Sequence, residues 1–245
     1  PERIRALADD TLVMGSPTRQ WWSDQAASVL KNFRDQVQRG YASGEGVDEI
    51  VRRIRGTRAL NYTDGTMNIA RRNAEALVRS SVQAISNSAR NETFDHNSDI
   101  IGAVQQISTM DSRTTVTCMA RSNLIWDLET KKPIDHFIPW NGGPPLHWNC
   151  RSVTVAVLKP LSGMPVRKRD AIQKNGTQAS VDGPISADMD YEDFLRTRSV
   201  EFQKDALGPG RWELWQEGRL TLAQMLDQSG NPMSLSQLRE KYGTK

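Results

Sequence analysis

The chain has 245 residues, of which 37% are hydrophobic and 25% are charged, so it holds enough apolar material for one core with helical attachments. Its 32 basic and 29 acidic side chains leave a net charge of +3, less basic than most proteins that bind DNA by neutralising phosphates. No stretch approaches the ~20 apolar residues of a membrane span, and two cysteines are too few for a disulfide scaffold. We therefore expect no membrane contact and synthesis in the cytoplasm with reduced thiols.

Residues 1–97 are predicted to be helical. Ser16 and Pro17 make a favourable helix start, because a hydroxyl can cap the first turn and the proline ring fixes a helical φ. We expect this helix to end at Gly40, and a short basic helix to follow over residues 47–55. The apolar residues of the first helix recur at helical spacing and are Trp22, Ala26, Val29, Leu30, Phe33 and Val37.

The longest predicted helix covers residues 66–91, where no glycine or proline interrupts the pattern. Its apolar stripe consists of Ala70, Ala74, Leu77, Val78, Ser81, Val82, Ile85 and Ala89. Four arginines lie mostly off this stripe, namely Arg71, Arg72, Arg79 and Arg90. We interpret them as a solvated face; the alternative is a contact face for DNA or for an acidic partner.

The character of the sequence changes after Asn97. Branched residues predict strands over residues 100–109 and 151–158, and the segments 124–127 and 132–137 flank a predicted hairpin turn. A loop is expected over residues 141–145, Asn-Gly-Gly-Pro-Pro. Residues 98–160 are therefore predicted to form a small, mainly antiparallel β unit that packs against the preceding helix, which makes the fold class α+β.

Residues 161–190 are polar and rich in glycine and proline, which predicts a linker or an extended arm. The basic cluster Arg167-Lys168-Arg169 in it is interpreted as a solvated loop. Residues 191–245 are predicted to be a helical C-terminal extension, with helices over residues 191–206 and 211–217. A last helix begins at a capping box formed by Ser234 and Gln237.

The two cysteines of the chain, Cys118 and Cys150, fall at the two ends of the β unit, and His147 precedes Cys150 by three residues. Zinc prefers sulfur and nitrogen ligands, so these three residues could share a zinc ion with His136, Asp111 or water as the fourth ligand. Alternatively, the cysteines pair as a disulfide or pack as buried thiols without metal. We favour the interpretation without metal and expect no cofactor.

The segment Asp111-Ser112-Arg113-Thr114, then Cys118, then Pro144-Pro145-Leu146-His147-Trp148-Asn149-Cys150-Arg151-Ser152 resembles the Mu F-like phage head morphogenesis family, also called minor head proteins. The resemblance covers roughly residues 69–157. It rests on Asp111, Arg113, Thr114, Cys118, His147, Asn149, Cys150 and Arg151, which stand in the family's order. The chain departs from the family at Thr115, Trp148 and Ser152, where members often have Cys, Pro and Cys, and this weakens a metal site.

A second similarity lies in the tail. The segments 191–195, 207–211, 220–222 and 235–238 look like the C-terminal extension common in such proteins. The family resemblance implies a structural minor head protein of a tailed bacteriophage, inside the capsid near the portal, and in the host cytoplasm during assembly. It implies the portal protein and/or the major capsid protein as partners, with packaged DNA as a further contact, and a role in head assembly, DNA packaging or genome delivery.

Large aromatic side chains dominate interface energetics, so four tryptophans are candidate partner anchors: Trp21, Trp22, Trp212 and Trp215. Each can equally be an ordinary core residue. Adjacent helical residues cannot both face one core, so we expect either Trp21 or Trp22 to meet a partner or a neighbouring segment.

Asp111 and Arg113 are predicted to be structural, because an arginine fork can bind a carboxylate and pin the β unit; an active-site pair is the alternative. The chain contains no Gly-x-Ser-x-Gly elbow, phosphate-binding glycine loop or His-Glu-x-x-His helix. A thiol–imidazole pair of His136 with Cys118 or Cys150 has no recognisable third group. We therefore expect no enzyme, with a DNA-binding virion module and a Cys/His-dependent enzyme as the alternative functions.

Overall fold

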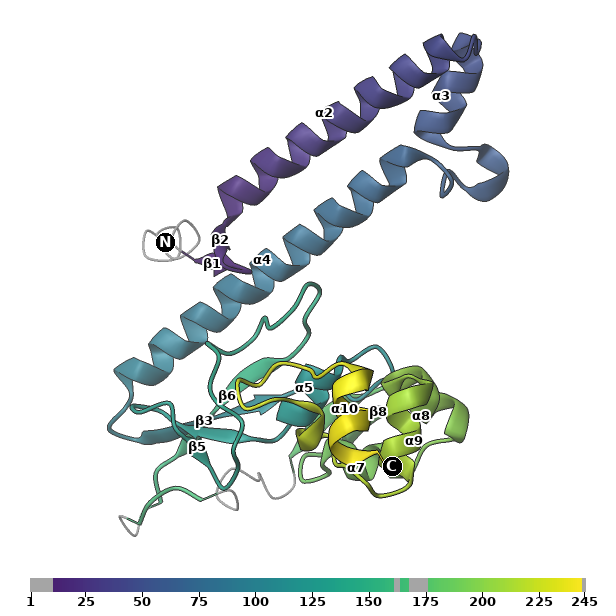
Figure 1. The fold of residues 1–245 in the computed structure, drawn as a ribbon. Coiled ribbons are helices and arrows are strands. Elements are labelled where there is room, and N and C mark those ends of the chain that lie inside the picture. The colour runs from purple at the N-terminus through teal and green to yellow at the C-terminus, as the bar shows by residue number, and fades with distance from the viewer. Residues whose placement is uncertain (1–10, 161–163, 168–175, 244–245) are drawn as a thin grey trace. The chain divides into compact units, whose positions relative to one another are not determined.

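A computed structural model describes residues 11–160, 164–167 and 176–243 (Figure 1). They form two compact units, one within residues 1–85 with 147–149, and one within residues 86–146 with 150–245. The boundary between the units falls inside one continuous helix, between Ile85 and Ser86. The sequence-based division at Asn97 follows the end of that helix instead, because a break in a helical pattern is the signal that a sequence offers.

The first unit is a helical arm, by which we mean residues 18–85. Two short antiparallel strands precede it, β1 (Leu12–Val13) and β2 (Ser16–Pro17). The arm consists of α2 (Thr18–Ala42), α3 (Val47–Arg55), the 3-10 turn η1 (Arg58–Leu60) and the first part of α4 (Thr66–His96). In Figure 1, α3 lies at the end of the arm where α2 ends and α4 begins.

Both predicted ends of the first helix are wrong. Ser16 lies in β2, and Pro17 occupies the N-cap position without a side-chain cap, because β1 and β2 already order this segment. Gly40 does not end the helix, which continues to Ala42. Gly40 is buried instead, and a β-carbon at this position would collide with Ile50 of α3, so the glycine permits close approach of the two helices. Helix α3 has the predicted bounds.

Helix α4 extends five residues beyond the predicted end, from Asn91 to His96. Its buried face consists of Leu77, Ser80, Ser81, Ala84 and Asn87. The predicted stripe is therefore wrong at Val78 and Val82, which are 48% and 59% exposed. Two neighbouring stripes of this helix are apolar, and helical periodicity alone does not say which one faces a core. The four arginines of α4 are exposed, as the solvated-face interpretation requires.

The second unit is built on a four-stranded antiparallel sheet in the order β5-β4-β3-β6. The central strand β3 (Ile101–Ile107) pairs with β4 (Ile125–Asp127) and β6 (Val153–Leu158), and β5 (Pro133–Ile134) pairs with β4. The α+β class, the antiparallel unit and its hairpin are confirmed. Sequence patterns missed α5 (Val116–Arg121), because six residues carry too little helical periodicity to detect.

The predicted linker contains a hairpin, so an extended arm is wrong for this part of it. Strands β7 (Thr177–Ser180) and β8 (Gly183–Ser186) pair with each other. The hairpin is anchored by Gln178, which is buried and donates from Nε2 to the carbonyls of Ser186 and Met189. Buried polar anchors leave no apolar alternation, which is why the pattern resembled a linker. Lys168 and Arg169 lie outside the described residues, and Arg167 is exposed.

The C-terminal extension packs into the core of the second unit. It consists of α7 (Tyr191–Arg196), α8 (Val200–Leu207), α9 (Pro209–Gln216), η2 (Ala223–Met225) and α10 (Leu235–Tyr242). The predicted helix over residues 191–206 is two helices, because Ser199 caps a new one through the Phe202 N–H. The capping box of Ser234 and Gln237 is confirmed. The shared core includes Trp126, Phe194, Leu195, Trp215, Met225 and Leu238.

Among the described residues, no helix combines the length and the apolar character that a membrane crossing requires.

Candidate functional site

The Asp-Ser-Arg-Thr motif forms a tight turn between β3 and α5. The carboxylate of Asp111 is almost buried and accepts a hydrogen bond from the backbone N–H of Arg113 at 3.0 Å. The hydroxyl of Thr114 donates to the carbonyl of Thr109 at 2.6 Å and closes the turn. The turn therefore holds one carboxylate at a fixed position below the surface of the second unit.

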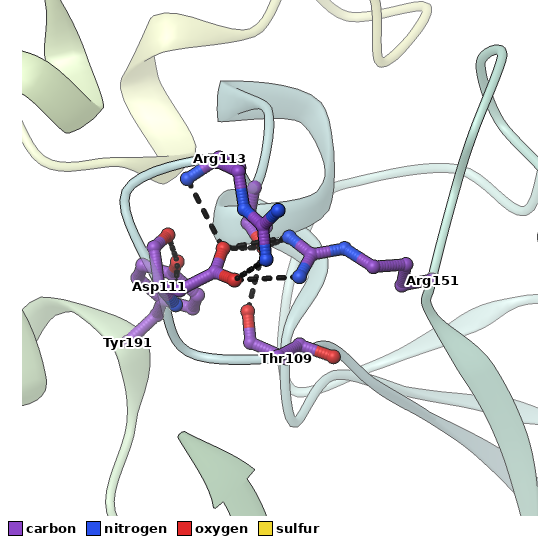
Figure 2. Close-up of polar contacts among 6 residues, drawn as sticks. Thr109, Asp111, Arg113, Arg151 and Tyr191 are labelled. Carbon is purple, nitrogen blue, oxygen red and sulfur yellow. Dashed lines mark hydrogen bonds and ion pairs between the residues drawn. The ribbon is translucent and has the colours of Figure 1, made fainter. Parts of the chain in front are cut away.

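Arg151, at the entry to β6, binds this carboxylate with both arms of its guanidinium (Figure 2). Nη1 lies 2.5 Å from Oδ2 of Asp111, and Nη2 lies 2.6 Å from Oδ1. Nη2 also donates to the hydroxyl of Thr114 at 3.3 Å. Such a bidentate, charge-assisted pair fixes orientation as well as adding energy. We call these three residues, together with Tyr191 at the start of α7, the carboxylate clasp.

The expectation that Arg113 pins the β unit through its fork is wrong. Its guanidinium lies 3.5 Å from Oδ2 of Asp111, but its side chain is 81% exposed. Arg151, forty positions away in sequence, provides the fork instead. Sequence proximity favoured Arg113, whereas the antiparallel pairing of β3 with β6 brings Arg151 close to Asp111.

The clasp keeps Asp111 ionised. Burial by itself raises the pKa of this carboxyl, but the hydrogen bonds and positive charge of Arg151, together with the Arg113 backbone, outweigh burial and lower the pKa. The hydrogen bond from Asp111 in turn raises the pKa of Arg151. Both partners are thereby stabilised in their charged forms, which suits a permanent structural pair better than a group that exchanges protons.

Tyr191, the first residue of α7, ties the C-terminal extension to the motif. Its hydroxyl donates to the carbonyl of Asp111 at 2.7 Å and accepts from the Asp111 N–H at 3.2 Å. Burial raises the pKa of this phenol, so it remains neutral. Next to it, the backbone of Met110 exchanges hydrogen bonds with Ala179 and Val181 of the β7–β8 hairpin. Tyr191 and the β7–β8 hairpin thus both contact this part of the chain through specific polar contacts.

Cys118 and Cys150 lie together, as the sequence argument required. Both thiols are buried and form no disulfide with each other, because their sulfurs are 3.7 Å apart and a disulfide bond is about 2.05 Å long. The hydrogen bond with Cys150, and then burial, raise the pKa of Cys118, so this thiol stays protonated. Protonated, buried thiols are poor nucleophiles.

Ser152 stands where the family resemblance implies a further cysteine. It is buried, and its hydroxyl lies 2.9 Å from that of Ser108. Ser108 in turn donates to the carbonyl of Cys118 at 2.9 Å. A hydroxyl network therefore occupies the position at which a third thiolate would have been needed for a sulfur-rich metal shell.

Two of the other candidate ligands, His136 and Asp111, are engaged by other groups. The ring nitrogens of His136 contact the backbone of Ile125 and Ile138, at 2.8 and 3.2 Å, so both are used in holding the β4–β5 region. The carboxylate of Asp111 is held by Arg151. His147 belongs to the first unit, where its Nδ1 lies 2.9 Å from the carbonyl of Trp148. A zinc site at the thiols stays a prediction.

Residues 147–149 contact other parts of the first unit. The Asn149 N–H donates to the hydroxyl of Ser80 at 3.0 Å. Trp148 packs edge-on against Trp21 with ring centroids 5.1 Å apart. Both tryptophans line a cavity of about 500 Å³ between α2 and α4, whose apolar walls include Val29 and Leu77. The family motif thus contributes residues to both compact units.

The four candidate tryptophan anchors differ in exposure. Trp22 is 42% exposed, whereas Trp21 turns inward and donates to the carbonyl of Val13, so the two neighbours do face different ways. Trp215 is 2% exposed and donates to Glu192 within the core, so it is wrong as a partner anchor. Trp212 is half-buried under Lys204 and donates to Gln203.

Sequence reasoning missed two residues that shape the second unit. Tyr191 appeared only as the start of the tail, although its phenol binds the motif. Arg121 is 1% exposed beside the ring of Trp126, and it donates from Nη1 to the carbonyl of Pro139. Within the described part of the chain, its Nε and Nη2 have no hydrogen-bond partner. A buried arginine without a carboxylate has no sequence signal.

Comparison with known protein families gives one result. The model of a family described as Phage Mu protein F like protein matches residues 31–155, just over half of the chain. The matched range begins in α2, ends in β6 and contains both Asp111 and Arg151, whereas Tyr191 lies beyond it. Neither the curated proteins nor the solved structures gave a match. The chain belongs to the Phage Mu protein F like family, whose members are phage head-related proteins.

Proposed function

We propose that the chain is a structural minor head protein of a tailed bacteriophage that docks inside the capsid near the portal. In this role it assists head assembly, DNA packaging or genome delivery, and it catalyses no reaction. The family match across α2 to β6 carries this proposal. The portal protein and/or the major capsid protein are the partners that we propose, with packaged DNA as a further contact and no membrane.

The chemistry of the motif supports a non-catalytic role. The carboxylate of Asp111 is saturated by Arg151 and by backbone, and its low pKa makes it a weak base. The Cys118 thiol is protonated, and His136 is bound to the backbone by both ring nitrogens, which removes the support for a thiol–imidazole pair. A set of groups already paired with one another is typical of residues that stabilise a fold.

The test is the composition of heads and tails purified separately from the phage that encodes the chain. We expect mass spectrometry to find the chain in heads, in few copies relative to the major capsid protein, and not in tails. A null mutant should give heads with reduced infectivity that a plasmid copy restores. Absence of the chain from purified heads, or full infectivity of the null mutant, contradicts the proposal.

We further propose that the thiol pair binds no metal. Metal analysis of the purified chain should find zinc far below one equivalent. Because both thiols are buried and Cys118 is protonated, a thiol-specific reagent should modify them slowly in the native protein and modify both at once after denaturation. Stoichiometric zinc, or rapid modification of the folded chain at neutral pH, contradicts this proposal.

A further inference from the structure

Helix α2 carries an apolar stripe on its exposed side, which we call the α2 stripe. It consists of Trp22, Ala26, Leu30, Phe33 and Val37, spaced by 4, 4, 3 and 4 residues. At about 100° per residue this spacing places all five side chains within one narrow sector of the helix. The four large ones are 42%, 51%, 47% and 38% exposed. Soluble proteins seldom expose such a continuous apolar row without a partner.

The charges beside the α2 stripe have one sign. Within roughly a quarter turn of the stripe on either side, α2 carries Arg19 and Arg34 but no acidic residue. The acidic residues Asp24 and Asp35 lie on the opposite side of the helix. Both arginines are exposed, and within the described part of the chain neither has an ion pair or a hydrogen bond. The surface therefore combines an apolar row with unneutralised positive charge.

We propose that the α2 stripe is a docking surface for an amphipathic α-helix that carries acidic residues beside its apolar face. The row from Trp22 to Val37 extends for about 22 Å, at 1.5 Å per residue, which corresponds to about four turns of a partner helix. Trp22 and Phe33 are the aromatic anchors, and Arg19 and Arg34 pair with the partner's carboxylates. That the helix belongs to another head protein rests on the proposed function.

The same charges argue against other occupants. A second copy of the chain would set two acid-free, arginine-bearing faces against each other, and like charges across an interface oppose association. DNA would neutralise the arginines but leave the large apolar side chains between them in water. An acidic amphipathic helix satisfies both features of the surface at once.

The experiment uses the full chain and two synthetic helical peptides of about 21 residues, or three heptads. Both peptides have the same leucine stripe, and they differ only in having glutamate or lysine beside it. Fluorescence anisotropy should show that the glutamate peptide binds at least about tenfold more tightly than the lysine peptide, an advantage that added salt reduces. Equal affinity for both peptides, or no binding to either, overturns the proposal.

Matched variants locate the binding surface. Phe33→Glu should weaken binding of the glutamate peptide by about tenfold or more, because it places a charge in the apolar row. Val82→Glu adds the same charge at an exposed apolar position of α4, outside the row, and should change affinity less than about threefold. Both positions are exposed, so circular dichroism should show unchanged folding. An equal loss in both variants overturns the proposal.

Light scattering of the chain alone tests whether a second copy of the chain occupies the α2 stripe. A dimer that dissociates in the Phe33→Glu variant contradicts the proposal. Preferential binding of a short duplex DNA that Arg19→Gln and Arg34→Gln abolish, without peptide binding, contradicts it in favour of DNA. Neither result bears on the presence of the chain in phage heads. Failure of the docking surface is therefore distinguishable from failure of the proposed function.

Discussion

The two compact units of the chain use apolar residues differently. In the second unit, large side chains such as Trp126, Phe194 and Trp215 are buried in one core that joins the sheet to the C-terminal helices. In the helical arm, Trp22, Leu30 and many other large apolar side chains are exposed. The second unit therefore has the means to be stable by itself, whereas the arm presents surface that a partner can cover.

The two units also differ in their polar contacts. The second unit is held by long-range polar contacts as well as by its core, with Asp111 as the centre where Arg151 and Tyr191 meet. Among the described residues, most polar contacts in the arm are local, such as the pair of Arg71 with Glu75 one turn away, although Gln25 also donates to the carbonyl of Ala70. Local contacts keep a helix helical, but only long-range contacts specify a tertiary structure.

Core truncation is the strongest way to test the contrast. Trp126 is fully buried and donates to the carbonyl of Ile138, so Trp126→Ala should lower the free energy of unfolding of the second unit by about 4 kcal/mol. Trp22→Ala on the arm should change the measured free energy of unfolding by about 0.5 kcal/mol or less. Urea titrations followed by circular dichroism measure both. Equal losses in the two variants would show that the arm is also part of a core.

The clasp offers the next largest effect. Arg151→Ala leaves the Asp111 carboxylate buried without its fork and should cost roughly 2 kcal/mol of unfolding free energy. Arg113→Ala removes a side chain that is 81% exposed and should cost about 0.5 kcal/mol or less. The same urea titration decides. A larger loss of unfolding free energy for Arg113→Ala than for Arg151→Ala would show that Arg113 is the main structural partner of Asp111.

The clasp also predicts how stability depends on pH. Because the folded pKa of Asp111 lies below the unfolded value of about 3.9, its contribution is complete well above that pH and disappears as the pH falls through the folded pKa. Between about pH 5 and pH 2, Asp111→Asn should therefore lose stability less steeply than the parent, by up to about 1.4 kcal/mol per pH unit. The measurement is the free energy of unfolding of both proteins as a function of pH. The same slope for Asp111→Asn and for the parent would contradict the prediction.

The smallest predicted effect concerns the contact between the tail and the motif. Tyr191→Phe removes the hydroxyl that bonds both backbone groups of Asp111 and should cost about 1 kcal/mol. Tyr41→Phe alters a phenol that is 86% exposed and should change stability by less than about 0.5 kcal/mol. Thermal denaturation of the two variants compares them. No difference between them would mean that the tail is held by its apolar core alone.

The sequence by itself determined the elements whose signals are local. Helix α3, the strands around the β4–β5 hairpin and the capping box at Ser234 could be predicted because backbone geometry, periodicity and capping depend on residues a few positions apart. The order of motif residues around Asp111 and Cys150 also sufficed for the family. The sequence did not reveal short elements such as α5 or polar elements such as the β7–β8 hairpin.

Only the tertiary structure decided which residues meet. It selected Arg151 over Arg113 as the fork, placed Tyr191 on the motif from eighty positions away, buried Trp215 and left Trp22 exposed. Each outcome depends on how strands and helices distant in sequence pack, and composition or periodicity carries no information about that packing. The two thiols came together for the same reason: strand pairing closes the long loop between them.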